Sequence, residues 1–306
     1  MTLFITIFSA RSVRKKLFLF LALAVTLPLM LGSRTSLGES KPQPKVPLQA
    51  KRVITLSPHL TEIVDAAGGT SQLVSVSAFS NYPESVKKLP ITSDARSIDL
   101  EKMKQLKPDL IIYWRGGTPE TQIESIQKIF AHSAQIIFVE PKKLNDIATD
   151  IEKLGQLLGT SALAQKNAAS FRSEVAQLKK KYHNAQKRKV RVFYQVWAQP
   201  LMTINHDHLI SDIIELCGGE QLFAKEKLLV PTVSKEAVVK ANPEIIFTAV
   251  DAKQMKTDWT MWQSIPQLAA TQKKAFIEID ADTISRPSQR VLSGALKICS
   301  EIDKIR

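Results

Sequence analysis

EKMKQLKPDLII, at residues 101–112, occurs a second time in the chain as EAVVKANPEIIF, at residues 236–247. Each copy predicts a helix, a turn made of proline and an acid, and then a short apolar strand. A second pair precedes these copies, because TEIVDAAGG at 61–69 matches SDIIELCGG at 211–219. Here we expect a Thr or Ser followed by an acid to begin a helix, and two glycines to end it. The chain therefore contains one α/β unit twice.

Strands are predicted at the beginning and end of each unit, at 52–56, 136–139, 191–195 and 275–279. Apolar strands that alternate with helical patterns indicate parallel sheets covered on both faces. We therefore expect an α/β protein with two Rossmann-like lobes, an N-terminal lobe at 51–141 and a C-terminal lobe at 190–306.

A long helix is predicted in the linker region, 142–189. After Thr160 and Ser161, small or apolar residues recur in steps of three and four, at Ala164, Ala168, Phe171, Val175, Leu178 and Tyr182. No Gly or Pro interrupts residues 162–184, so the helix would be about 35 Å long. The two lobes are thus expected to be joined by a single long rigid helix.

Residues 1–38 have the order of a signal peptide. Four basic residues, Arg11 to Lys16, precede an apolar run at 17–31 that is short for a membrane span and contains Pro28. Cysteine does not follow the run, so a lipid anchor is not expected. Residues 39–50 are a Pro-rich spacer. We expect an exported, periplasmic, monomeric protein.

The net charge of +13 includes five basic residues within 1–38, which leaves +8 for the rest. A basic cluster near the end of the long helix has no aromatic residues among its members, so a nucleic-acid partner is not expected. Cys217 and Cys299 are the two cysteines. In an oxidising compartment they predict one disulfide, and two buried thiols are the alternative.

Ligand sites of open α/β sheets lie beyond the carboxyl ends of the strands. In the first lobe this places candidate segments at 57–59, 78–82 and 113–117, and in the second lobe at 196–198 and 282–286. Phe79 and Trp114, with Gly116 and Gly117 beside them to allow close approach, predict an aromatic platform for a large planar ligand. The alternative for Trp114 is a place in the lobe core.

Four motifs carry a resemblance to a known family: RVITLSPHLTE at 52–62, SNYP at 80–83, LKPDLIIYWRGG at 106–117 and CGGE at 217–220. Over residues 51–305 the chain resembles the cobalamin-binding members of the helical-backbone (class III) substrate-binding proteins of ABC importers. The resemblance implies capture of a corrinoid between the lobes and delivery to a transporter in the inner membrane.

The resemblance also implies site residues. Phe79 and Trp114 match aromatic ligand contacts, and a segment of the second lobe matches a ligand-contacting loop, consisting of Asp282, Thr283, Ile284, Ser285 and Arg286. Tyr82, Arg115 and Trp197 are further candidate contacts. Cys217 and Cys299 match the family's disulfide. Glu101 and Glu236 match carboxylates that dock on the permease dimer, and the repeat also makes them equivalent. Acids favoured at helix N-termini are the alternative for this pair.

The chain departs from the family's cobalamin binders where further aromatics are usual, at Ala95, Val196, Val230 and Thr283. Haem or a ferric siderophore is therefore an alternative ligand for the same architecture, with Tyr82, Tyr113 or His59 as axial ligand of a haem.

Two other classes are less favoured. His206-Asp207-His208 is a compact donor cluster for a metal ion, with a solvated loop as the alternative. For an enzyme the chain offers Ser57 beside His59, but no Gly-x-Ser-x-Gly, His-Glu-x-x-His or phosphate-binding loop. We expect no catalytic activity, no resident metal and no cofactor.

Overall fold

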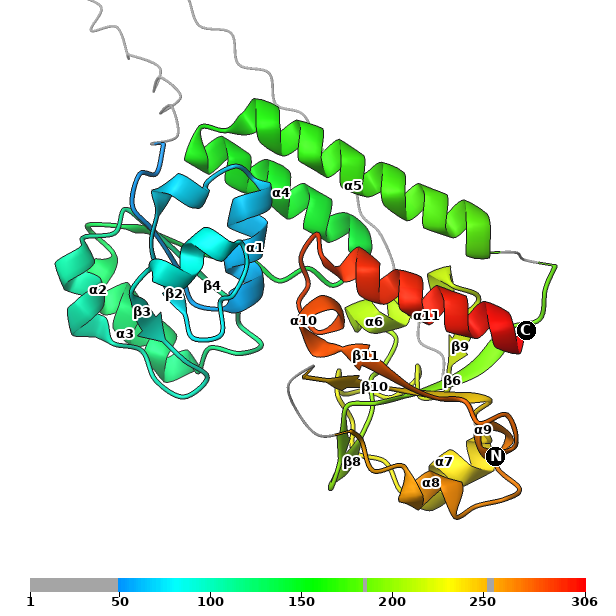
Figure 1. Cartoon of the computed structure of the whole chain (residues 1–306). Coiled ribbons are helices and arrows are strands. Elements are labelled where there is room, and N and C mark those ends of the chain that lie inside the picture. Colours follow the sequence, from blue (N-terminus) through cyan, green and yellow to red (C-terminus); the bar gives the residue numbers. More distant parts are fainter. Residues whose placement is uncertain (1–48, 184–185, 252–255) are drawn as a thin grey trace, which may run out of the picture. The chain divides into compact units, whose positions relative to one another are not determined.

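Two parallel sheets form the frame of the protein (Figure 1). The computed structural model describes residues 49–183, 186–251 and 256–306, all within one compact unit. The predicted signal peptide and most of the spacer lie outside the described residues. Within those residues, the structure contains no helix with the length and apolar character needed to cross a bilayer.

The N-terminal sheet has the strand order β3-β2-β1-β4-β5. Its strands are β1 Val53–Thr55, β2 Leu73–Ser77, β3 Ile91–Ser93, β4 Leu110–Tyr113 and β5 Gln135–Phe138. The helices of this lobe are α1 Pro58–Ala66, α2 Leu100–Leu106 and α3 Glu120–Phe130, with short 3-10 turns at Thr70–Gln72 and Glu84–Lys88.

The C-terminal sheet has the order β11-β10-β6-β9. Its strands are β6 Val190–Gln195, β9 Gly219–Gln221, β10 Ile245–Val250 and β11 Phe276–Asp280, and a hairpin is made by β7 Trp197–Ala198 and β8 Leu201–Met202. The helices are α6 Leu209–Leu216, α7 Lys235–Ala241, α8 Thr260–Gln263, α9 Ala269–Gln272, α10 Ala281–Ile284 and α11 Val291–Ile305. The order β2-β1-β4-β5 thus recurs as β9-β6-β10-β11, and the predicted fold class is confirmed.

The acid of the repeated proline-acid turn accepts equivalent backbone hydrogen bonds in both lobes. Asp109 accepts hydrogen bonds from the backbone N–H groups of Lys51 (2.8 Å) and Arg52 (2.9 Å), just before β1. Glu244 accepts one from the N–H of Arg191, in β6 (3.3 Å). The acid before β4 or β10 therefore ties that strand to the first strand of its lobe.

The repeated glycine pairs end helices as predicted. Gly68 and Gly218 follow α1 and α6 with φ of 84° and 81°, a left-handed conformation that glycine adopts without steric cost. The predicted helix starts at Thr61 and Ser211 were wrong, because α1 begins at Pro58 and α6 at Leu209.

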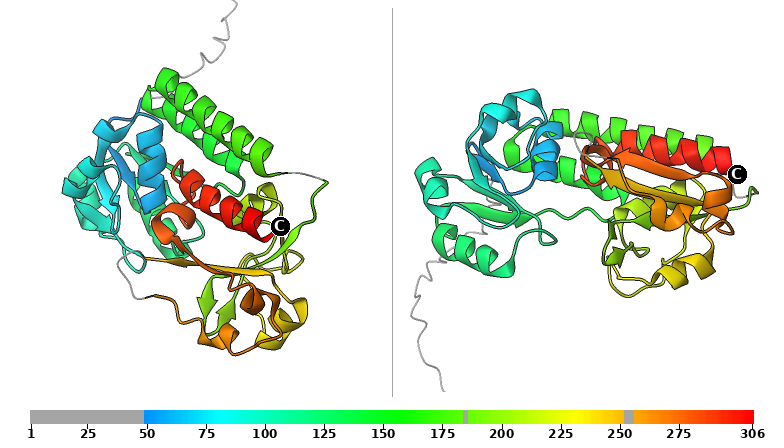
Figure 2. Two further views of the ribbon diagram at one scale, coloured as in Figure 1. Left: turned by 45° about the vertical axis from the view of Figure 1, so that its right-hand side comes forward. Right: turned by 60° about the horizontal axis from the view of Figure 1, so that its bottom comes forward.

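Three segments connect the lobes (Figure 2). Residues 139–143 lead from β5 to the C-terminal lobe, where the N–H of Leu144 donates to Asp212 (3.0 Å). Helix α4, Leu144–Leu158, returns to the N-terminal lobe, where the carbonyl of Leu157 accepts from the N–H of Ala50 (2.8 Å). Helix α5, Ser161–Tyr182, is the predicted long helix and crosses again. Helix α4 is an addition to the expected architecture.

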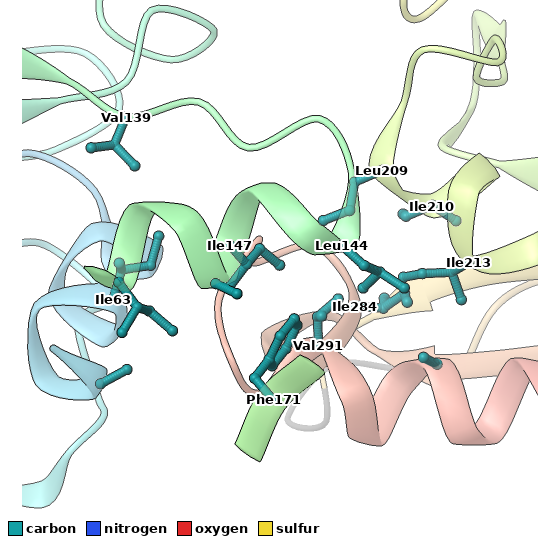
Figure 3. Close-up of a cluster of buried hydrophobic side chains, with 14 of the residues drawn as sticks. Ile63, Val139, Leu144, Ile147, Phe171, Leu209, Ile210, Ile213, Ile284 and Val291 are labelled. Carbon is teal, nitrogen blue, oxygen red and sulfur yellow. The ribbon is translucent and has the colours of Figure 1, made fainter. Parts of the chain in front are cut away.

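One buried apolar cluster extends through both lobes (Figure 3). It joins Ile63 of α1 to Ile213 of α6, by way of Leu144 and Ile147 of α4 and Phe171 of α5. Burial of one such side chain contributes roughly 1.5–3 kcal/mol. The lobes therefore share a core that holds them together.

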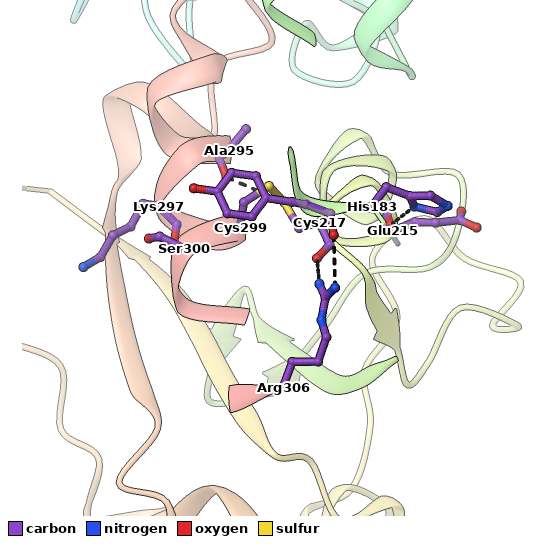
Figure 4. Close-up of a disulfide and its surroundings, with 9 residues drawn as sticks. His183, Glu215, Cys217, Ala295, Lys297, Cys299, Ser300 and Arg306 are labelled. Atoms are coloured by element: carbon purple, nitrogen blue, oxygen red, sulfur yellow. Dashed lines mark hydrogen bonds between the residues drawn. A yellow bond between two sulfur atoms is a disulfide. The ribbon is translucent and has the colours of Figure 1, made fainter. Parts of the chain in front are cut away.

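Cys217 and Cys299 form the predicted disulfide, which joins the end of α6 to α11 (Figure 4). Arg306 closes the same region, because its guanidinium donates to the carbonyl groups of Cys217 (2.6 Å) and Tyr182 (3.1 Å). The disulfide lies within the C-terminal lobe.

Candidate ligand-binding cleft

A cavity of about 230 Å³ lies between the lobes. The N-terminal lobe lines it with Trp114 and Gly116, which follow β4, and the connection after β5 lines it with residues 140–142. The C-terminal lobe contributes residues 207–210 at the start of α6, Leu229 and Val230 after β9, and residues around α10. The cavity therefore lies at the carboxyl ends of strands of both sheets, where the sequence places a ligand.

Trp114 is half-buried, lines the cavity and packs against the shared core. A Cβ atom on Gly116 would lie 2.6 Å from Cζ2 of the indole, and one on Gly117 would lie 2.5 Å from Cε3. The two glycines thus let their own loop close on the ring of Trp114. Gly116 also lines the cavity, so the predicted close approach of a ligand at these glycines stays a prediction.

His59 is buried beside Trp114, with the ring centroids 5.2 Å apart and the planes at 87°. Its Nδ1 lies 2.5 Å from the hydroxyl oxygen of Ser57. Burial, with a smaller effect from the charge of Arg286, lowers the pKa of His59 to about 3. The Ser57–His59 pair therefore exists, but its imidazole is too weak a base to activate the hydroxyl at neutral pH.

Phe79 follows β2 and exposes 79% of its surface. Its φ of 65° is left-handed, a conformation that costs a residue with a Cβ roughly 1–2 kcal/mol. The backbone carbonyl of Phe79 accepts a hydrogen bond from Nη2 of Arg286, in the other lobe (3.1 Å). The predicted platform residue is thus held by a predicted residue of the second lobe.

Asp282 and Arg286 form an ion pair at 2.5 Å, and both contact the loop after β2. Asn81 donates to Asp282 (2.7 Å) and accepts from Arg286 (2.7 Å). The structure therefore brings Phe79, Asp282 and Arg286 together, as the sequence predicts. The guanidinium of Arg286 binds protein groups of both lobes, so it bridges the lobes.

The other residues of the second-lobe segment have separate surroundings. Thr283 lies within α10, and its hydroxyl donates to the carbonyl of Asp280, the N-cap residue of that helix (2.8 Å). Ile284 is buried in the shared core, and both Ile284 and Ser285 line the cavity.

Tyr82, Arg115 and Trp197 lie around this group. Tyr82 is 39% exposed, with the guanidinium of Arg290 4.7 Å from its ring centroid. Arg115 stacks on Phe138 of β5 at 4.2 Å, and the indole N–H of Trp197 donates to the carbonyl of Gln199 within its own hairpin (2.8 Å). Among the described residues, the cavity lining includes none of these three side chains.

Leu229, which lines the cavity, and its exposed neighbour Leu228 were not predicted from the sequence. Leu228 is 67% and Leu229 is 45% exposed, and the carbonyl of Leu229 accepts from the N–H of Asn205 (3.0 Å). The repeat contains the signal that would have found them. Because β9 is the counterpart of β2, the segment after β9 is the counterpart of the loop that carries Phe79.

Residues 53–283 match the family of periplasmic binding proteins. The chain belongs to this family. A vitamin B12-binding protein from Vibrio parahaemolyticus is 33% identical over 280 residues, covering 92% of this chain and 96% of the relative. One from Yersinia pestis is 36% identical over 256 residues, covering 84% and 88%.

Solved structures show the same relationship as the sequence relatives. The periplasmic vitamin B12 binding protein of Vibrio cholerae has a TM-score of 0.75 at 34% identity, covering 85% of this chain and 99% of that one. A periplasmic heme-binding protein from Roseiflexus has a TM-score of 0.71 at 19% identity, covering 84% and 99%, which is a likeness of fold alone. The resemblance noted in the sequence is therefore confirmed.

Periplasmic binding proteins are non-enzymatic components of transport, and membership of the family implies export. The alternative metal site receives no support from the geometry. His206 lies 3.1 Å from Asp207, and Nδ1 of His208 accepts from the N–H of Ile210 at the start of α6 (3.2 Å). Across residues 49–183, 186–251 and 256–306, no group of three or more His, Cys, Asp or Glu residues is placed to hold a metal ion.

The two predicted docking carboxylates of this periplasmic binding protein occupy matching positions. Glu101 is in the first turn of α2, whose N-cap is Asp99, and Glu236 is in the first turn of α7, whose N-cap is Ser234. Both are exposed, and Glu101 pairs with Lys104 (2.8 Å).

Proposed function

We propose that this periplasmic binding protein captures a corrinoid of the cobalamin class between its lobes and delivers it to an ABC transporter. One observation carries the ligand assignment. A cavity lined by Trp114, with Phe79 exposed at the loop after β2, occurs in a chain that is 34% identical to a vitamin B12 binding protein over nearly all of that structure. Flat aromatic surfaces suit a large planar macrocycle.

The size of the cavity determines how such a ligand binds. At about 230 Å³ it is smaller than the roughly 300–1,000 Å³ usual for small-molecule sites. A corrinoid therefore fills the cavity with one part and extends over the exposed side chains outside it. Leu229 lines the cavity, and Phe79 and Leu228 supply apolar surface for the remainder.

The ligand is tested with the protein that begins at residue 39. Calorimetric titration with cyanocobalamin and with cobinamide is expected to give micromolar or tighter binding. Haem, titrated in parallel, serves as the competing ligand. Absence of heat and of competition with both corrinoids, together with clear binding of haem, would overturn the corrinoid assignment.

A haem ligand is the second candidate, and Tyr82 is the observation that favours it. Tyr113 is 5% exposed and His59 is 4% exposed, whereas Tyr82 presents 39% of its surface. A tyrosine oxygen can serve as an axial ligand of haem iron. Haem binding through Tyr82 would give a Soret band that Tyr82→Phe shifts or removes.

Delivery places one carboxylate of each lobe against one half of a permease dimer. Glu101 and Glu236 are proposed for this contact, because they are equivalent in the repeat and exposed. Charges at the rim of an interface mainly steer the partners together and fix their register.

A further inference from the structure

Glu62, on α1, is a carboxylate with no exposed surface, and three groups of the other lobe bind it. Arg286 and Arg290 lie 3.0 Å and 2.9 Å from Oε1, and the hydroxyl of Ser288 donates to Oε2 (2.5 Å). All three come from the short segment between α10 and α11. A charge taken out of water requires such partners, so this contact depends on the spacing of the lobes.

The two arginines continue from Glu62 to the aromatic residues of the first lobe. Arg286 donates to the carbonyl of Phe79 (3.1 Å), and Arg290 lies over the ring of Tyr82 (4.7 Å). Phe79 has a left-handed backbone, although it is neither glycine nor part of a helix end. Such a conformation persists only where the surroundings hold it.

We propose that Glu62 is a positioning residue for ligand capture, which orients Phe79 through Arg286. This Glu62–Arg286–Phe79 relay leaves the N-terminal lobe and returns to it. Both of its contacts cross between the lobes, so separation of the lobes would break both and free the loop after β2. The relay thus links the distance between the lobes to the presentation of the ring. The inference rests on the proposed function for its ligand, a planar corrinoid.

A double-mutant cycle tests the relay, with cyanocobalamin as the probe. Glu62→Gln is expected to weaken binding about tenfold, because Arg286 then keeps only Asp282 as a charged partner and loses the one on the N-terminal lobe. In a Phe79→Ala background the same change is expected to weaken binding by less than about twofold, because the residue that it positions is gone. Equal losses in both backgrounds would overturn the relay and leave Glu62 a structural role only.

Glu244→Gln is the matched control. Glu244 is also a buried carboxylate with several basic partners, Arg188 (2.8 Å) and Lys273 (2.7 Å) among them, but none of them belongs to the N-terminal lobe. We expect it to lower the melting temperature without changing the affinity. If Glu62→Gln does not fold, Arg286→Lys replaces it, because one ammonium group cannot bridge Glu62 and Phe79 as the guanidinium does.

Hydrogen exchange separates this inference from the proposed function. In the ligand-free protein, the amides of residues 78–82 are expected to exchange faster in Glu62→Gln than in wild type or Glu244→Gln. Unchanged exchange would refute the relay whether or not a corrinoid binds. If the wild type binds no corrinoid, the proposed function fails while the exchange result still decides the relay.

Discussion

At the scale of single residues, burial determines the chemistry of the cleft. His208 lines the cavity and His59 packs against Trp114, and burial lowers their pKa values to about 4 and about 3. Both side chains are therefore neutral at the pH at which a free histidine begins to take up a proton. The imidazole of His59 supports Trp114 as an uncharged ring.

This burial predicts an acid-sensitive stability. The folded pKa of His59, about 3, is below its unfolded value of 6.5, so the unfolded chain binds more protons between these values. The stabilisation that depends on neutral His59 should be fully present above pH 6.5. The free energy of unfolding should decrease as the pH falls from 6.5 toward 3. His59→Asn should reduce the decrease between pH 7 and pH 5, as measured by urea denaturation at each pH.

His132→Asn is the control for this experiment, because His132 is exposed in the loop after α3. It should leave the difference between pH 7 and pH 5 as in wild type. An identical decrease in the wild type and in His59→Asn would contradict the assignment to His59.

At the scale of elements, the loop after β9 completes the cleft from the second lobe. Backbone hydrogen bonds hold it, from the N–H groups of Thr203 and Asn205 to the carbonyls of Pro231 and Leu229 (3.0 Å each). Two leucines are thus presented to solvent on an anchored backbone. This arrangement favours contact with an apolar part of a ligand.

Leu228→Ser combined with Leu229→Ser should weaken cyanocobalamin binding by about tenfold, or about 1.4 kcal/mol. The free energy of unfolding should change by less than about 0.5 kcal/mol, because both side chains are exposed. Calorimetric titration and urea denaturation give the two values. Leu296→Ser, on α11, replaces a leucine that is 46% exposed and should change neither. Unaltered affinity in the double variant would remove these leucines from the site.

The repeat made most elements predictable, whereas the helix starts depended on contacts that a sequence does not display. The hydroxyl of Thr61 bonds to that of Thr55 (2.7 Å), and the hydroxyl of Ser211 donates to the carbonyl of Asn205 (2.6 Å). Both residues therefore lie inside the first turns of their helices and do not cap them. Helix α4 was not predicted, because its role as a second helical connection depends on contacts with both lobes that the sequence does not display.

The candidate site was likewise predictable only in part. Phe79 and Trp114 were predictable because the carboxyl ends of parallel strands meet at one edge of a sheet. The roles of Glu62 and Leu229 depend on how closely the second lobe approaches, which a pattern within either lobe does not specify.

At the scale of the whole molecule, the repeat sets out a matched pair of acidic positions. The first turns of α2 and α7 carry Glu101 and Glu236, and each helix ends in a left-handed residue, Lys107 or Asn242. Two equivalent carboxylates suit a partner with two equivalent halves.

Glu101→Lys combined with Glu236→Lys should abolish uptake of radiolabelled cyanocobalamin by vesicles that contain the cognate transporter. The affinity for cyanocobalamin in solution should be unchanged, because both residues lie outside the cavity lining. Glu120→Lys with Glu220→Lys makes the same change in net charge at exposed acids of the two lobes and should preserve uptake. Full uptake by the first variant would refute the docking assignment.

The apolar cluster shared by the lobes also limits how readily the lobes can open. Because the segment 139–143, α4 and α5 all cross between the lobes, and α4 and α5 are buried against both, a wide opening would expose side chains such as Ile147 and Phe171 to water. A ligand whose release requires such an opening would leave slowly, because the exposure of these side chains to water is costly. The shared core would therefore set the residence time of a ligand whose release requires a wide opening.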